Sequence, residues 1–198
     1  SQTLQKNEKI KVQYLSNTSL NISCLLSLGQ MLGVNKTLQK IDFSYNNFLE
    51  KDLITMFFRE KLINLKRIDL SSCRFDEYQT NMLLKFLLDN NSLTHLTLND
   101  TKFFKGNLMR VLKYLAEVPS LKELHLSNFN IFKKEMSEFF IRLRKNKSTL
   151  NKITLQSIDF EEESFRSFSQ FLYQNQQLEE IIINEINLPL NVFSLMVE

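Results

Sequence analysis

The sequence predicts an α/β solenoid in which short parallel strands alternate with helices along the 198 residues. Two observations support this prediction: an apolar pattern that returns every 27 to 29 residues, and helical periodicity after each copy. The composition agrees, because only 3 Gly and 2 Pro leave little material for the tight turns of an all-β fold. We expect one domain, residues 1–198. Its apolar ending, NLPLNVFSLMVE, suggests part of a longer chain.

Each copy of the pattern has apolar residues at its first, fourth, sixth and eleventh positions, as in LQKIDFSYNNF. The copies begin at Ile10, Leu38, Leu65, Leu93, Leu121, Leu150 and Leu178. The first copy, IKVQYLSNTSL, is weakened by Gln13 at an otherwise apolar position. Because the register is held in seven copies, chance spacing of leucines is a poor explanation.

A helix is predicted after each copy. Apolar residues return three positions apart, as in Leu25 with Leu28 and Phe165 with Phe168, which marks one face of a helix. The acidic run Glu161 to Glu163 lies near a predicted helix start, where it suits the helix dipole. Each unit is therefore a strand, a turn and a helix of about three turns.

The pattern resembles the leucine-rich repeat, L-x-x-L-x-L-x-x-N/C-x-L, and a repeat near 28 residues with a full helix is similar to the ribonuclease-inhibitor-like subfamily. This resemblance implies a horseshoe arc of about seven repeats, with parallel strands on the concave face and helices on the convex face. The arc follows because strands stack about 4.8 Å apart whereas helices need about 8 to 10 Å. The subfamily includes Ran GTPase-activating proteins, actin regulators of the tropomodulin and CARMIL types, and ciliary subunits.

The ninth position of the pattern is expected to hydrogen-bond the turn, as the resemblance implies. It is held by Thr18, Asn46, Cys73 and Thr101, and then by Phe129, Ile158 and Ile186. Cys73 is therefore predicted to be a buried structural thiol, and Cys24, next to Leu25 on a helix, is predicted to lie in the core. Two cysteines are too few for a disulfide scaffold or a four-cysteine metal site, which favours a reducing compartment.

The sequence predicts no enzyme, cofactor or metal site. The phosphate-loop, dinucleotide and metalloprotease motifs are missing from the sequence. His95 and His125 are expected to face outward from neighbouring strands, and Asp69 is the one further ligand candidate nearby. Solvent-facing histidines are the favoured interpretation.

The concave face is the strongest candidate for partner binding, because its outward residues are expected to have no role in the core. The candidates on this face are Tyr14, Lys40, Asp42, Arg67, Asp69, His95, Glu123 and His125. Mixed charge of this kind sets specificity and association rate more than affinity. A weaker candidate site on the rim consists of Phe104 and Phe132, which hold the same position in adjacent repeats. Packing of these two rings against the following helix is an equal alternative.

The net charge of +3 is unevenly distributed. Residues 102–152 hold 12 Lys and Arg against 4 Asp and Glu, a net +8, whereas residues 153–198 hold 1 against 8, a net −7. Nucleic-acid binding is disfavoured, because these cations are expected mainly on helices and loops. Membrane insertion is also excluded, since no apolar run approaches about 18 residues.

We therefore predict a non-catalytic protein–protein interaction scaffold in the cytoplasm. A structural subunit of a large cytoskeletal or ciliary assembly is favoured. The C-terminal end is expected to dock on further chain or on a partner subunit, or to cap itself with a final helix. The alternatives are a GTPase regulator of the Ran GTPase-activating type, for which no catalytic residue matches by motif, and an actin-regulator repeat domain.

Overall fold

The computed structural model describes residues 7–48, 58, 64–104, 106–129, 133–158 and 160–186, without the side chains of 133 and 134. The main sheet contains β1 (Val12–Tyr14), β2 (Lys40–Asp42), β3 (Arg67–Asp69), β5 (His95–Thr97), β7 (Glu123–Ser127), β8 (Lys152–Gln156) and β9 (Glu180–Asn184). A second sheet pairs β4 (Arg74–Phe75) with β6 (Lys102–Phe103). The helices are α2 (Ile22–Val34), α4 (Glu77–Asp89), α5 (Asn107–Leu115), α6 (Lys133–Lys145) and α7 (Glu162–Gln174).

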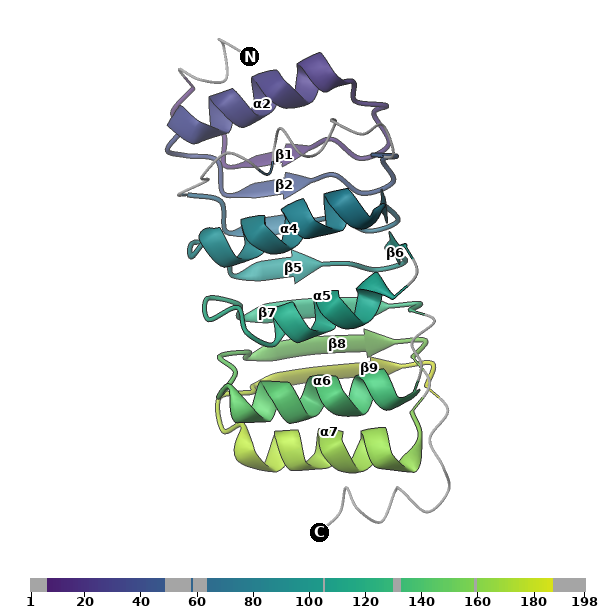
Figure 1. Ribbon diagram of the computed structural model, residues 1–198. Coiled ribbons are helices and arrows are strands. Elements are labelled where there is room, and N and C mark those ends of the chain that lie inside the picture. Colours follow the sequence, from purple (N-terminus) through teal and green to yellow (C-terminus); the bar gives the residue numbers. More distant parts are fainter. Residues whose placement is uncertain are drawn as a thin grey trace.

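The strands of the main sheet lie in the order of the chain, and every neighbouring pair is parallel. The described helices form a second layer over one face of this sheet (Figure 1). Parallel neighbours need a crossover connection, and α2, α4, α5, α6 and α7 each lie in one of these connections. The predicted α/β fold with a parallel sheet is confirmed.

The same turn follows each strand of the main sheet. Its left-handed residues, with φ between 50° and 58°, are Asn17, Tyr45, Ser72, Asp100, Asn128, Ser157 and Glu185. Each is the eighth position of its copy of the pattern. The N–H of Tyr45 donates to the carbonyl of Ser71 at 2.8 Å, in the next unit along the chain. The turn therefore joins neighbouring units as well as reversing the chain.

The ninth position of the pattern stabilises this turn, as predicted. Asn46 Nδ2 donates to the carbonyl oxygens of Leu15 at 2.7 Å and Phe43 at 2.9 Å, and Asn46 Oδ1 accepts from the N–H of Thr18 at 3.2 Å. Because Asn46 is 4% exposed, these bonds satisfy an amide that would otherwise be costly to bury.

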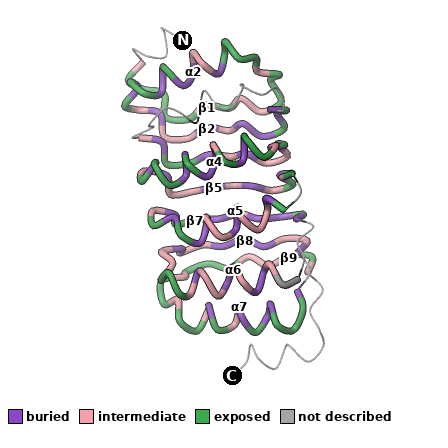
Figure 2. The backbone as a smooth tube through the Cα atoms, in the orientation of Figure 1, coloured by how far each residue is buried: buried purple, intermediate pink, exposed green. Residues whose placement is uncertain are grey.

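Phenylalanines fill much of the space between the layers. Phe48, Phe75, Phe103 and Phe129 stack in series, with ring centroids 6.2, 5.6 and 6.4 Å apart. Buried residues alternate with half-buried or exposed ones along the helices, so that each described helix turns one face to the core (Figure 2). These rings come from different units, and their contacts link each unit to the next.

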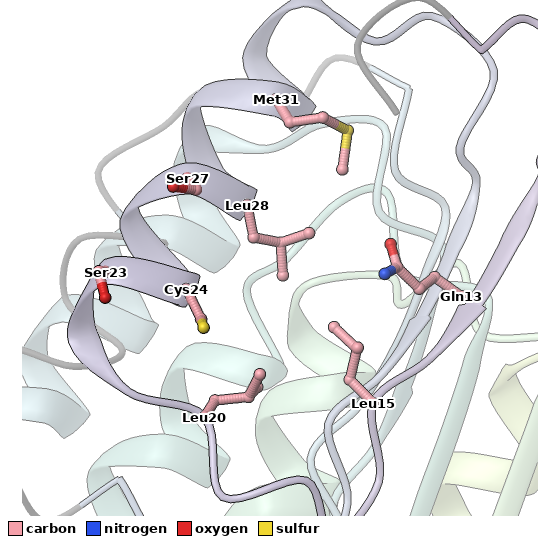
Figure 3. Close-up of a pocket in the computed structure, with 8 residues that line it drawn as sticks. All are labelled: Gln13, Leu15, Leu20, Ser23, Cys24, Ser27, Leu28 and Met31. Atoms are coloured by element: carbon pink, nitrogen blue, oxygen red, sulfur yellow. The ribbon is translucent and has the colours of Figure 1, made fainter. Parts of the chain in front are cut away.

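The prediction for Cys73 is confirmed, and the prediction for Cys24 is wrong. Cys73 is 0% exposed, its thiol donates to the carbonyl of Phe43 at 3.3 Å, and burial raises its pKa to about 12. Cys24 is exposed, beside an apolar hollow of about 430 Å³ between α2 and β1 (Figure 3). Gln79 holds the same position as Cys24 in a later copy of the pattern. It is buried, and its side-chain amide donates to the carbonyl of Phe48 in the preceding unit. No described unit precedes that of Cys24.

A thiol-reactive chromophore tests this difference between the two cysteines. In the folded protein at mildly alkaline pH, we expect one thiol per chain to react, because Cys24 is exposed whereas Cys73 is buried with a raised pKa. Urea should release the second. A Cys24→Ser variant provides the control and should show no rapid reaction before unfolding. Reaction of both thiols in the folded protein would contradict the burial of Cys73.

Candidate functional site

The first and third residues of the short strands form two columns on one face of the main sheet. One column runs Val12, Lys40, Arg67, His95, Glu123, Lys152, Glu180, and the other runs Tyr14, Asp42, Asp69, Thr97, His125, Thr154, Ile182. We call these two columns the solvent face. The residues between them lie on the opposite side, where those of the inner strands, such as Ile41 and Leu96, are buried. The eight residues predicted for partner binding therefore lie together on the solvent face.

Glu123 lies on the solvent face in β7, with its two carboxylate oxygens toward the two histidines. Its Oε1 lies 2.7 Å from His95 Nε2 and its Oε2 lies 3.9 Å from His125 Nε2. The Thr94 hydroxyl lies 2.6 Å from His95 Nδ1. Across the described residues, no cluster of three or more His, Cys, Asp or Glu is arranged to hold a metal ion. The arrangement is a polar network, held in place by the strands.

The histidines of this network favour the neutral form. Burial lowers the pKa of His95 below 6.5, and the charge of Arg67 acts in the same direction while Glu123 opposes both. Burial also lowers the pKa of His125, with Lys152 as the next cause. At neutral pH, both rings are therefore uncharged hydrogen-bonding groups on the solvent face.

The stability of the protein should fall as the pH drops below about 6.5. A histidine whose pKa is lower in the folded state binds more protons when unfolded, so its contribution is complete above the unfolded pKa and is lost below it. We expect the urea midpoint to fall between about pH 7.5 and about pH 5.5, and to fall less in His125→Gln. An equal fall in both proteins would show that His125 does not contribute.

Asp42 and Asp69 have a structural role that the sequence analysis did not foresee. Asp42 Oδ1 accepts from the backbone N–H of Ser44 and Asp69 Oδ1 from that of Ser71, each at 2.9 Å. A carboxylate bound to the N–H two residues later fixes the start of a turn. These two side chains hold the turn after their strands while lying on the solvent face.

Substitution of Asp69 separates its structural role from its charge. Asp69→Ala removes the acceptor for the Ser71 N–H and should lower the free energy of unfolding by about 1 kcal/mol. Asp69→Asn keeps an acceptor oxygen and should leave the stability close to that of the parent. Equal stability of all three proteins in urea would show that the turn does not depend on this bond.

A groove crosses the solvent face at the starts of the strands. It holds about 640 Å³ and is lined by Lys11, Val12, Gln39, Lys40, Lys66, Arg67, Thr94, His95, Lys122, Glu123 and Asn151. We call it the strand-start groove. The sequence analysis did not predict this groove, because it did not compare the residues at the second position of the pattern across the copies. The signal was present, since this position is Lys in the first, third and fifth copies.

The predicted rim site is described in part. Phe104 is 60% exposed, so this ring is free to make contact with a partner. Phe132 lies outside the described residues, and the pairing of the two rings stays a prediction. In the part of the chain that the structure describes, no helix is long and apolar enough to cross a membrane.

No protein family and no curated protein matches this sequence, but solved structures match its fold. Actin-binding site 2 of leiomodin-1 matches with a TM-score of 0.53 at 15% identity, over 88% of this chain and 86% of that chain. The tropomodulin C-terminal domain from Caenorhabditis elegans matches with 0.54 at 14%, over 88% and 89%. An internalin from Listeria monocytogenes matches with 0.50 at 12%, over 97% of this chain and 60% of that chain.

These likenesses establish a fold of the leucine-rich-repeat type. At such low sequence identity, a shared fold does not show a shared activity. None of the three matched proteins is described as an enzyme, in agreement with the prediction of a non-catalytic chain.

Proposed function

We propose that this chain is a protein-binding module of the actin-regulator type. The observation that supports the proposal most is the solvent face, on which polar and charged side chains are held by the parallel strands. The fold supports actin as the partner, because a described actin-binding site matches over 88% of this chain. We further propose a horseshoe arc of about seven repeats of the ribonuclease-inhibitor-like kind, acting as a scaffold in an intracellular cytoskeletal assembly.

The solvent face offers the groups that protein partners use. Tyr14 is 67% exposed, and Lys40 Nζ lies 5.2 Å from the centre of its ring. This pair combines an aromatic anchor with a charge that lies on the ring and stays accessible. Glu123 and the two histidines add hydrogen-bonding groups in fixed positions. A partner would therefore meet an ordered surface, which lowers the entropy lost on binding.

Binding to purified actin tests the proposal. We expect the parent chain to sediment with actin filaments or to bind monomeric actin in a titration. The double variant Tyr14→Ser, Lys40→Glu should bind more weakly. Its matched control is Tyr173→Ser, Lys145→Glu on the helix layer, which also removes an exposed tyrosine and reverses a lysine. Failure of the parent to bind either form overturns actin as the partner, and equal loss in both variants overturns the solvent face as the site.

A further inference from the structure

The strand-start groove is built on a continuous backbone ladder. The N–H of Gln39 donates to the carbonyl of Lys11 at 2.8 Å, that of Lys66 to Gln39 at 2.8 Å, and that of Thr94 to Lys66 at 2.9 Å. The N–H of Lys122 then donates to the carbonyl of Thr94 at 2.8 Å. The second-position residues therefore stand side by side across the sheet, and a lysine returns at every second step from Lys11 to Lys122.

Positive charge exceeds negative charge in this groove. Lys11, Lys66, Arg67 and Lys122 make no ion pair with any described residue. The one carboxylate in the lining, Glu123, is 2.7 Å from His95. Several cations along one hollow give a positive potential that attracts and orients an anionic ligand.

The spacing of the cations indicates the shape of the ligand. With strands about 4.8 Å apart, lysines on every second strand stand about 10 Å apart, and the groove from β1 to β8 is about 24 Å long. A polyproline II segment is extended and rises about 3.1 Å per residue with three residues per turn, so about eight residues span this groove and every third side chain points toward a lysine. The amide and hydroxyl groups of Gln39, Thr94 and Asn151 alternate with the lysines and suit the backbone of a peptide.

We propose that the strand-start groove binds an extended acidic segment of a partner protein, with carboxylates that meet Lys66 and Lys122. This inference rests on the proposed protein-binding function but does not require the partner to be actin. It concerns residues that lie beside the Tyr14 and Lys40 pair, so the two sites form one continuous surface on the same face.

A nucleic acid fits this groove less well than an acidic peptide. Sequence-tolerant binding of single strands depends on aromatic rings on which bases stack, and His95 is the one aromatic residue in the lining. The ring of His95 is engaged by Glu123 and the Thr94 hydroxyl. Beyond Asn151, the ladder continues to Glu179, whose carboxylate would confine any anionic ligand to the stretch from β1 to β8.

Fluorescence anisotropy with a labelled peptide tests the inference. The probe is a peptide of about eight residues with Glu at every third position, to match the period of polyproline II, and Ser between, and its matched partner carries Gln in place of Glu. We expect the Glu peptide to bind the parent chain in a salt-dependent way and the Gln peptide to bind at least about tenfold more weakly. Equal binding of both peptides, or of neither, overturns the proposal.

A pair of charge-reversal variants locates the site. Lys66→Glu, Lys122→Glu should weaken binding of the Glu peptide by about tenfold or more, whereas Lys85→Glu, Lys145→Glu on the helices should not. All four positions are exposed, and circular dichroism checks that both variants fold. Equal loss in both variants overturns the groove as the site. Tighter, groove-dependent binding of a single-stranded oligonucleotide overturns the choice of ligand.

The same proteins separate this inference from actin binding. A parent chain that binds the peptide but not actin leaves the groove assigned and removes actin as the partner. If the parent does not bind the peptide, and actin binding survives Lys66→Glu, Lys122→Glu, then the groove is overturned as a peptide site and actin stays the partner.

Discussion

Leu124→Asp is expected to unfold the protein under conditions in which the parent chain is stable. Leu124 is fully buried in β7 and pairs with Leu96 on one side and Ile153 on the other. A carboxylate at this point has an apolar residue on either side, and burial of an unpaired charge costs several kcal/mol. That loss is comparable with the whole free energy of unfolding of a typical domain, about 5 to 15 kcal/mol.

Urea unfolding followed by circular dichroism measures this effect. Lys122→Asp is the control, because it places the same side chain two residues earlier at an exposed position. Its unfolding free energy should stay within about 0.5 kcal/mol of the parent. If Leu124→Asp unfolded with the parent, the inward register of β7 would be wrong.

The strands and their register were predictable because every repeat carries the same information. The buried Ile41 and Leu96 hold the fourth position of the pattern, and the residues on either side of them face solvent. A parallel sheet in chain order then aligns equivalent positions of neighbouring repeats. The two columns of the solvent face therefore follow from the repeat spacing and the parallel register, without knowledge of any side-chain contact.

The features that sequence reasoning missed depend on the turn conformation, on cover from a neighbouring repeat, and on a position of the pattern that carries no apolar signal. The apolar spacing does not reveal that Asp69 accepts from the N–H of Ser71, because this bond depends on the turn conformation. The exposure of Cys24 depends on whether a preceding repeat covers it, which periodicity does not state. The strand-start groove needed a comparison of the second position in all copies, and it contains the unpaired Lys66 and Lys122.

Phe140→Ala is expected to have the second largest effect on stability. The Phe140 ring is fully buried and lies 4.9 Å from that of Phe168, 5.5 Å from Phe139, 5.9 Å from Phe171 and 6.0 Å from Phe160, centroid to centroid. Removal of the ring leaves a cavity among rigid neighbours, at a cost of about 3 to 5 kcal/mol. Urea unfolding should show a lower midpoint for this variant.

Tyr173→Ala on α7 is the matched control, because this ring is 87% exposed and its loss should change stability by about 0.5 kcal/mol or less. Hydrogen exchange adds a spatial test. In a stack of repeats, each unit contacts its neighbours, so a cavity between α6 and α7 should weaken protection in β8 and β9 more than in β2 and β3. A uniform loss of protection would instead show that all repeats unfold as one cooperative unit.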